Sequence, residues 1–210
     1  TRRDEMLSVK NLSYQINECE ILDEISFSIH TGEKVGIIGE NGTGKSTLLD
    51  ILMGMKPYTK GEILWQSSIK KAILYQTSQF PPYIKVREVL QLFHRLNSHS
   101  LTLSELQPIC SIDNTSQFIH QLSGGQKRML DVALVLSKTP DFLILDEPTN
   151  HLDEKTKSKF WKTIQTFLKP ETSILIIMHD FKELKSFCDR IYMLENGKLK
   201  LIWQITPFKR

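Results

Sequence analysis

Hydrophobic and polar residues alternate in two stretches near the start of the chain, Leu7–Leu12 and Ile25–Ile29. This alternation predicts strands with one buried face, which we expect to be antiparallel. The next run, Lys34–Ile38, is nearly all apolar, as is typical of a strand that is covered on both faces of a parallel sheet. The N-terminal part of the chain is therefore expected to be rich in strands.

Downstream, short apolar runs alternate with stretches of helical periodicity. The apolar runs predict strands at Glu62–Trp65, Lys71–Tyr75, Phe142–Leu145 and Ser173–Met178. Apolar residues spaced three or four apart predict helices at Ser46–Met53, through much of Val86–Leu136, at Glu154–Leu168 and at Lys182–Phe187. Asn196-Gly197 predicts a hairpin between Arg190–Leu194 and Lys198–Ile202.

This order of elements predicts an α/β fold with a mixed sheet, antiparallel N-terminal strands and a small inserted helical subdomain at about residues 80–136. A length of 210 residues suits a single domain, 1–210. The chain does not begin with Met. Met6 precedes the first strand pattern, so we expect either that Met6 is the natural start or that the chain is a fragment.

Charge and cysteine content narrow the function classes. Lys and Arg number 27 against 24 Asp and Glu, a net charge of +3, which argues against a nucleic-acid-binding footprint. Three widely spaced cysteines favour a reducing cytosol over a disulfide framework or a zinc site. No apolar run approaches the ~20 residues of a membrane-spanning helix.

A glycine-rich loop follows the apolar strand Lys34–Ile38. Residues 39–47 read GENGTGKST and match the phosphate-binding pattern GxxxxGK[ST], with the expected strand before and helix after. Glycines let backbone N–H groups approach phosphate oxygens, and the helix N-terminus adds positive potential. We expect Lys45 to contact the β- and γ-phosphates and the Ser46 hydroxyl to bind Mg²⁺. The loop residues expected to bind nucleotide are Gly39, Asn41, Gly42, Gly44, Lys45, Ser46 and Thr47.

Two carboxylates end the buried strand at Phe142–Leu145. Asp146 and Glu147 would lie at the strand ends, where ligands bind in open α/β sheets. Asp146 is expected to hold Mg²⁺ through water, and Glu147 to polarise the attacking water. The alternative is an ordinary acidic turn before Pro148, which the phosphate loop disfavours.

A second candidate anion site lies at Leu122–Gln126, which reads LSGGQ and precedes a helix expected to start near Lys127. Ser followed by two Gly at a helix N-terminus can bind anions. Since one chain needs one such site for one nucleotide, the second predicts a site completed by another subunit. The alternative is a simple helix cap and loop.

These three motifs, in this order, resemble the nucleotide-binding domain of the ATP-binding cassette (ABC) family, for which LSGGQ is the signature. The resemblance extends from about Met6 to Ile202 and implies a phosphate-loop NTPase fold that hydrolyses ATP with Mg²⁺. It implies that two cassettes face head to tail. Each ATP then lies between the phosphate loop of one and the signature of the other, here Ser123, Gly124, Gly125 and Gln126.

The resemblance implies roles for three further residues. Gln76 resembles the family's Q-loop glutamine, which touches Mg²⁺ and the attacking water; Gln79 is the competitor. His179, after the strand Ser173–Met178, resembles the switch histidine that contacts the γ-phosphate and holds Glu147. Asp153 resembles the D-loop aspartate at the dimer interface.

The sequence departs from the family where an aromatic residue usually stacks on adenine. The matching position is Ile16, with Tyr14 two residues earlier, so either Tyr14 or an aliphatic contact is expected to hold the base.

Two functions fit the resemblance. Residues 80–90, FPPYIKVREVL, resemble bacterial exporter cassettes that drive a separate integral membrane permease, and we favour this function, with the protein peripheral on the cytoplasmic face of the membrane. Residues 147–153, EPTNHLD, resemble instead the ABC-F branch, soluble proteins with two cassettes that act on ribosomes. Only this alternative would make RNA a partner.

Overall fold

The computed structural model describes residues 4–77, 79–96 and 101–205. Its strands are β1 (Glu5–Ile16), β2 (Cys19–His30), β3 (Lys34–Ile38), β4 (Lys60–Trp65), β5 (Lys71–Leu74), β6 (Phe142–Asp146), β7 (Ser173–Met178), β8 (Arg190–Glu195) and β9 (Lys198–Gln204). Its helices are α1 (Lys45–Leu52), α2 (Val86–Leu96), α3 (Leu103–Cys110), α4 (Gly124–Leu136), α5 (Glu154–Phe167) and α6 (Phe181–Phe187), with a short 3₁₀ turn at Ile119–Gln121.

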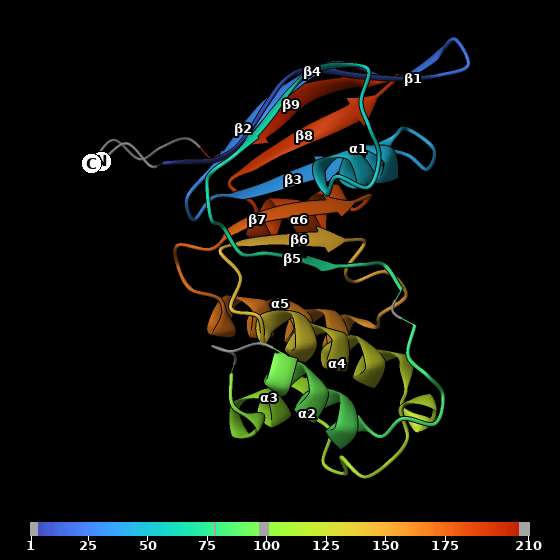
Figure 1. Cartoon of the computed structure of the whole chain (residues 1–210), viewed down its shortest axis with the longest axis vertical. Coiled ribbons are helices and arrows are strands. Elements are labelled where there is room, and N and C mark those ends of the chain that lie inside the picture. Colours follow the sequence, from blue (N-terminus) through green and yellow to red (C-terminus); the bar gives the residue numbers. More distant parts are fainter. Residues whose placement is uncertain (1–3, 78, 97–100, 206–210) are drawn as a thin grey trace.

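The main sheet has six strands in the order β5-β6-β7-β3-β8-β9 (Figure 1). All neighbours are parallel except β8 and β9, which form the hairpin predicted at Asn196-Gly197. A second sheet, β2-β1-β4, is antiparallel. The predicted fold class, an α/β fold with a mixed sheet and antiparallel N-terminal strands, is confirmed.

Alternate residues of the central strands enter two different cores. Ile174 and Ile176 of β7 pack with the helices α2–α6, whereas Leu175 and Ile177 pack with α1 and the antiparallel sheet. Both faces of the main sheet are therefore covered, which explains why its strands are nearly all apolar. The edge left open to ligands is at the strand ends, where the loops after β3, β5, β6 and β7 converge.

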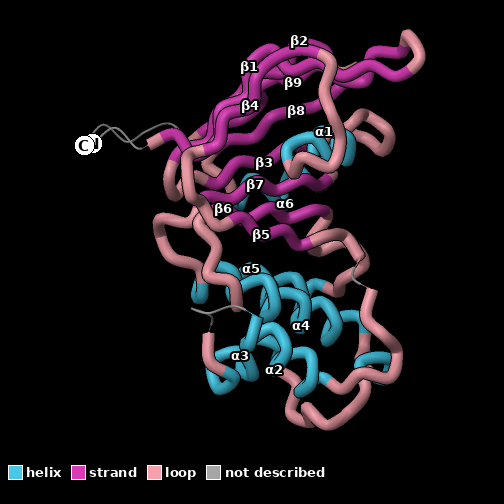
Figure 2. Tube along the Cα trace, in the orientation of Figure 1, coloured by secondary structure: helices cyan, strands magenta, loops and turns pink. Residues whose placement is uncertain are grey.

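The helices α2–α5 gather on the β5 side of the molecule (Figure 2). Their buried side chains form one continuous cluster with β5, β6 and β7. The bounds predicted for the single domain (1–210) and for the helical subdomain (80–136) stay predictions; residues 1–3, 97–100 and 206–210 lie outside the described residues.

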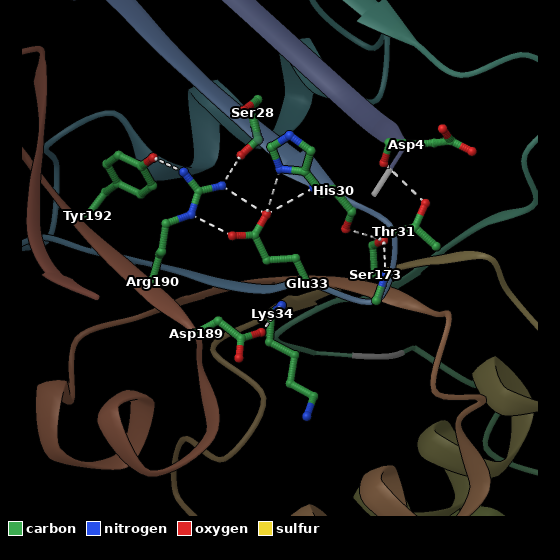
Figure 3. A network of polar contacts seen from close by, with 11 residues as sticks. Asp4, Ser28, His30, Thr31, Glu33, Lys34, Ser173, Asp189, Arg190 and Tyr192 are labelled. Atoms are coloured by element: carbon green, nitrogen blue, oxygen red, sulfur yellow. Dashed lines mark hydrogen bonds and ion pairs between the residues drawn. The ribbon is translucent and has the colours of Figure 1, made fainter. Parts of the chain in front are cut away.

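A network of polar contacts joins neighbouring strands near the start of β3 (Figure 3). The phosphate loop follows the other end of this strand. Glu33, just before β3, accepts hydrogen bonds from the Arg190 guanidinium, with Nη2 at 2.8 Å, and from the backbone N–H of His30 at 2.9 Å. Burial raises the pKa of the Glu33 carboxyl, but the bonds from Arg190 and His30 outweigh it and hold that pKa below its usual value. Arg190 also donates to the Ser28 carbonyl at 2.7 Å, so the network ties β2, β3 and β8 together.

Candidate functional site

A cavity of about 710 Å³ opens where the loops after β3, β5, β6 and β7 meet. Its size is that of a small-molecule site. The residues that line it are Ile16, Ile21, Glu40, Asn41, Gly42, Gly44, Lys45, Ser46, Thr47, Gln76, Asp146, Glu147, Asn150 and His179. Residues far apart in the sequence, expected separately to bind nucleotide or to act on it, thus face one space.

The phosphate loop is shaped by its glycines. A Cβ on Gly39 would lie 2.5 Å from the Leu194 carbonyl oxygen and 2.7 Å from Thr43 Oγ1, so only glycine fits there. Gly44 has a φ of 101°, which L side chains rarely adopt, and it caps α1. The loop is therefore held in one shape with the start of α1 turned toward the cavity.

Lys45 folds back onto this loop. Its Nζ donates to the carbonyl oxygens of Gly39 at 2.6 Å and Glu40 at 2.7 Å. Burial lowers the pKa of Lys45, while the negative charges of Glu147 and Asp146 oppose the shift. An ammonium has three N–H donors, so one stays available for a phosphate oxygen.

Asp146 is the last residue of β6 and Glu147 follows it; both line the cavity. Burial and the neighbouring Glu147 charge raise the pKa of Asp146, more than Arg128 and Lys45 lower it. Glu147 turns sharply away from the strand, with a φ of 43°, and its backbone N–H donates to the Ile177 carbonyl at 2.8 Å. A strained backbone of this kind is typical of functional positions.

His179 lies beside Glu147. Its Nδ1 is 2.9 Å from Glu147 Oε2, and it follows β7 as Glu147 follows β6. The carboxylate is thus oriented by an imidazole in the arrangement that a general base and its positioning partner require. The resemblance implied this pairing; the sequence alone gave no distance.

The oxygen donors around the cavity fit Mg²⁺ bound together with a nucleotide. Ser46, Gln76 and Asp146 offer a hydroxyl, an amide and a carboxylate, whereas Gln79 does not line the cavity. Within the described ranges, no cluster of three or more His, Cys, Asp or Glu could hold a metal by itself. Mg²⁺ usually takes only one or two protein carboxylates and completes its shell with water and phosphate oxygens, and it would supply charge neutralisation at the phosphates.

The end of the cavity nearest the β1–β2 hairpin is aliphatic. Ile16 and Ile21 line it, whereas Tyr14 packs against the N-terminal core and does not line the cavity. Like Ile63 and Trp65, Tyr14 is a partly buried residue packed against the N-terminal core, and the base-stacking role considered for it stays a prediction. Of the two candidates, Ile16 alone faces the cavity.

The signature residues form the start of α4, outside the cavity. The Ser123 hydroxyl accepts from the Gln126 N–H at 3.2 Å, and the Gln126 side-chain oxygen accepts from the Ser123 N–H at 2.9 Å. This reciprocal cap lets α4 begin at Gly124, so the predicted start near Lys127 is wrong by three residues. Asp153 caps α5 with its side chain alone, accepting from the Thr156 N–H at 3.0 Å, and it also lies outside the cavity.

Sequence reasoning missed Ile21, Glu40 and Asn150 at the cavity, and it missed Arg128 behind it. Arg128 is buried; its Nε donates to the Pro148 carbonyl and its Nη1 to the Tyr75 carbonyl, each at 2.6 Å. These two carbonyls belong to the residues next to Glu147 and Gln76. In the sequence, the only sign of such a contact is an arginine within the apolar pattern of α4.

The chain matches known proteins along most of its length. Residues 22–150 match the family model described as ABC transporter. A probable metal transport system ATP-binding protein of Thermotoga maritima is 34% identical over 195 residues, which cover 90% of this chain and 81% of that protein. The chain belongs to the ABC transporter family.

Other ABC relatives differ in length. The ATP-binding protein Uup of Buchnera aphidicola is 34% identical over 92% of this chain but only 33% of its own length. The Nod factor export ATP-binding protein I of Ralstonia nicotianae is 29% identical over 92% of this chain and 65% of its own. The chain thus spans from a third to two thirds of these two relatives.

A solved structure of an ATP-binding subunit of an ABC transporter has a TM-score of 0.81 with this chain, at 23% identity over 93% of this chain and 88% of that one. This likeness shows the ABC ATPase fold. The family hydrolyses ATP, and its ATPase domains bind ATP and ADP. Among the helices that the structure describes, none combines the length and the apolar content needed to cross a membrane.

Proposed function

We propose that the chain is the ATP-hydrolysing cassette of an ABC transporter, that it pairs head to tail with a second cassette, and that the pair drives a separate integral membrane permease. The observation that carries the proposal is the contact between Glu147 and His179 at 2.9 Å in a cavity shared with Lys45. The cavity thus contains a phosphate-binding cation, a base and the partner of that base.

In the proposed reaction, water attacks the γ-phosphate in line with the leaving phosphate. Lys45 and the loop N–H groups would stabilise phosphate charge, and Ser46, Gln76 and Asp146 would hold Mg²⁺, which would neutralise charge at the phosphates. Glu147 accepts the proton of the attacking water, and His179 holds Glu147 in place. Ile16 gives the base an aliphatic contact.

The second cassette supplies what the cavity of one chain lacks. Ser123, Gly124, Gly125, Gln126 and Asp153 lie outside the cavity, yet the cap at Ser123 leaves a helix N-terminus with positive potential. We propose that these residues contact the ATP bound to the partner cassette. Closure on ATP and reopening after hydrolysis would then drive the permease.

The direction of transport predicted from the sequence was export, from a cytoplasmic position on the inner face of the membrane. The relatives include Nod factor export proteins and a protein named for import of aliphatic sulfonates. They support a transport role without favouring a direction, so export stays a prediction.

An ABC-F-type ATPase that acts on ribosomes is the second candidate. It is favoured by the string EPTNHLD at residues 147–153. We expect the protein with ATP to bind membrane vesicles that contain its permease and to leave purified ribosomes unbound. Co-sedimentation with ribosomes alone would overturn the transporter proposal and favour this candidate.

ATP turnover tests the chemical part of the proposal. The purified chain should release phosphate from ATP only with Mg²⁺, and its mass in solution should double with Mg-ATP in a variant that cannot hydrolyse it. Absence of both hydrolysis and ATP binding would contradict the proposed function.

A further inference from the structure

Two helices start close to the Glu147–His179 pair. The loop after Glu147 leads into α5, which begins at Glu154, and His179 is followed by α6, which begins at Phe181. Each helix is thus linked along the chain to one member of the pair, α6 almost directly and α5 through residues 148–153.

Three side chains join α5 to α6, and we call them the α5–α6 brace: Lys157, Trp161 and Glu183. The Trp161 Nε1–H donates to Glu183 Oε1 at 2.6 Å, and Lys157 Nζ lies 3.8 Å from Glu183 Oε2. The Trp161 ring also packs on Phe187, with ring centroids 4.4 Å apart. A carboxylate is thus held by an indole N–H and an ammonium across the helix pair.

The brace is connected to the site at both ends. The Glu183 N–H donates to Asp180 Oδ1 at 3.0 Å, so the residue that carries the brace also fixes the first turn after His179. Lys157 and Glu183 line a small cavity of about 80 Å³ together with Glu147 and His179. The Glu183 side chain is only 12% exposed, so its bonds are shielded from competing water.

We propose that Trp161 and Glu183 are positioning residues for ATP hydrolysis, because the α5–α6 brace sets the distance between His179 and Glu147. The inference rests on the proposed function. Glu147 is connected along the chain to α5 and Trp161, and the Trp161 side chain is hydrogen-bonded to Glu183. Glu183 is connected through α6 to His179, which contacts Glu147. Loosening the brace would let the imidazole drift from the carboxylate while the phosphate loop, which is attached to β3, stays unchanged.

The test compares Trp161→Phe with Trp203→Phe. Phe keeps a six-membered ring against Phe187 but lacks the N–H together with the rest of the five-membered ring. Trp203→Phe makes the same change on β9, outside the brace, and is the matched control. Misplacement of reacting groups by about 1 Å costs up to about 100-fold, so we expect kcat to fall about tenfold in Trp161→Phe, with KM for ATP within about twofold. Glu183→Gln keeps the shape of the side chain and removes its charge, and we expect the same fall in kcat. If Trp161→Phe does not fold, Glu183→Gln tests the inference instead.

A His179→Ala background separates positioning from a general loss of structure. With the imidazole absent, Trp161→Phe should leave the residual rate unchanged, because the brace acts through His179. Equal loss of kcat in both backgrounds, or no loss in either brace variant, would overturn the inference.

A readout without hydrolysis separates failure of the brace from failure of the proposed function. The ¹⁵N resonances of the His179 ring, assigned by comparison with His179→Ala, report its hydrogen bond to Glu147 in nucleotide-free protein. Their chemical shifts should change in Trp161→Phe and remain unchanged in Trp203→Phe. Unmoved resonances would overturn the brace, whereas absence of ATP hydrolysis by the wild type would contradict only the proposed function.

Discussion

Arg128 reaches from the signature helix α4 to the carbonyl oxygen of Pro148, the residue after Glu147, with Nε 2.6 Å from that oxygen. Its Nη1 makes an equally short bond to the Tyr75 carbonyl, just before Gln76. One guanidinium therefore joins the helix that would face the partner's ATP to two loops of the chain's own site.

Replacing Arg128 tests this connection. Lys has one nitrogen and cannot reach both carbonyls in a fixed fork. We expect Arg128→Lys to bind ATP normally and to lower kcat by about 10-fold to 100-fold, because Gln76 and Glu147 lose their common support. Steady-state hydrolysis with a separate ATP titration measures both. Lys127→Arg is the matched control on the same helix, and wild-type turnover in Arg128→Lys would contradict the role.

Glu147→Gln should separate binding from chemistry. The amide cannot accept the proton of water, and general-base catalysis is worth about 100-fold to 10,000-fold, so hydrolysis should fall by that factor while ATP affinity stays. Single-turnover phosphate release and equilibrium ATP binding check the two parts. A wild-type rate would mean that Glu147 is not the base.

Asp146→Asn should stabilise the nucleotide-free protein at neutral pH and abolish its Mg²⁺ response. Burial and Glu147 raise the native pKa of Asp146, so this carboxyl contributes stability that is fully present below its unfolded value of 3.8 and is lost as pH rises through the folded pKa. At pH 7 the ionised form therefore costs native stability, which Asn removes; for a chain of this size each kcal/mol gained raises Tm by about 2–4 °C.

Melting curves at pH 7 and pH 4 check the sign. The advantage of Asp146→Asn should shrink at the lower pH, where a larger fraction of the wild-type carboxyl is protonated. Asp113→Asn, at an exposed position, is the control. A lower Tm for Asp146→Asn than for wild type at pH 7 would contradict the prediction.

Glu33→Gln should show the opposite pH dependence. The bonds from Arg190 and His30 hold the native pKa of Glu33 below 4.5, so its stabilisation is present above that value and is lost as pH falls through the folded pKa. We expect Glu33→Gln to lower the free energy of unfolding at pH 7 by about 1.5–3 kcal/mol, the contribution typical of hydrogen bonds to charged groups. This difference from wild type should become smaller in acid. Denaturant unfolding measures it; Glu195→Gln, which is exposed, should change little.

Those parts of the site that are formed by residues adjacent in the sequence could be predicted. The strand Lys34–Ile38, its loop and the acidic end of β6 are each encoded by adjacent residues, and the structure contains the predicted strands. Contacts between distant segments could not be predicted. β4 pairs with β1 across about fifty residues, with Leu7 opposite Trp65 and Ser13 opposite Lys60.

The start of α4 was also missed, whereas that of α5, which Asp153 caps, was predicted correctly at Glu154. Two glycines opposed a helix at Gly124, yet the reciprocal bonds of Ser123 and Gln126 stabilise its first turn. Likewise, the reach of Arg128 to Tyr75 and Pro148 depends on how α4 packs, which no local pattern determines.

Complementation between two variants tests directly whether each ATP is shared between two cassettes. Lys45→Ala removes the phosphate-binding cation. Gly124→Asp places a carboxylate at the signature, and it is cleaner than a change at Gly125, where a Cβ would crowd Thr156 at 3.2 Å; around Gly124 there is open space. Gly124→Asp monomers should still bind ATP.

Each variant alone should hydrolyse no ATP, since both sites of its homodimer are damaged. In a mixed head-to-tail dimer, one site combines the intact phosphate loop of one chain with the intact signature of the other. The measurement is ATP hydrolysis by an equal mixture of the two variants. Half of the dimers would be mixed, each with one working site, so we expect recovery of up to about a quarter of the wild-type rate. No recovery, together with loss of ATP binding by Gly124→Asp monomers, would show that the signature acts within its own chain and would contradict the shared site.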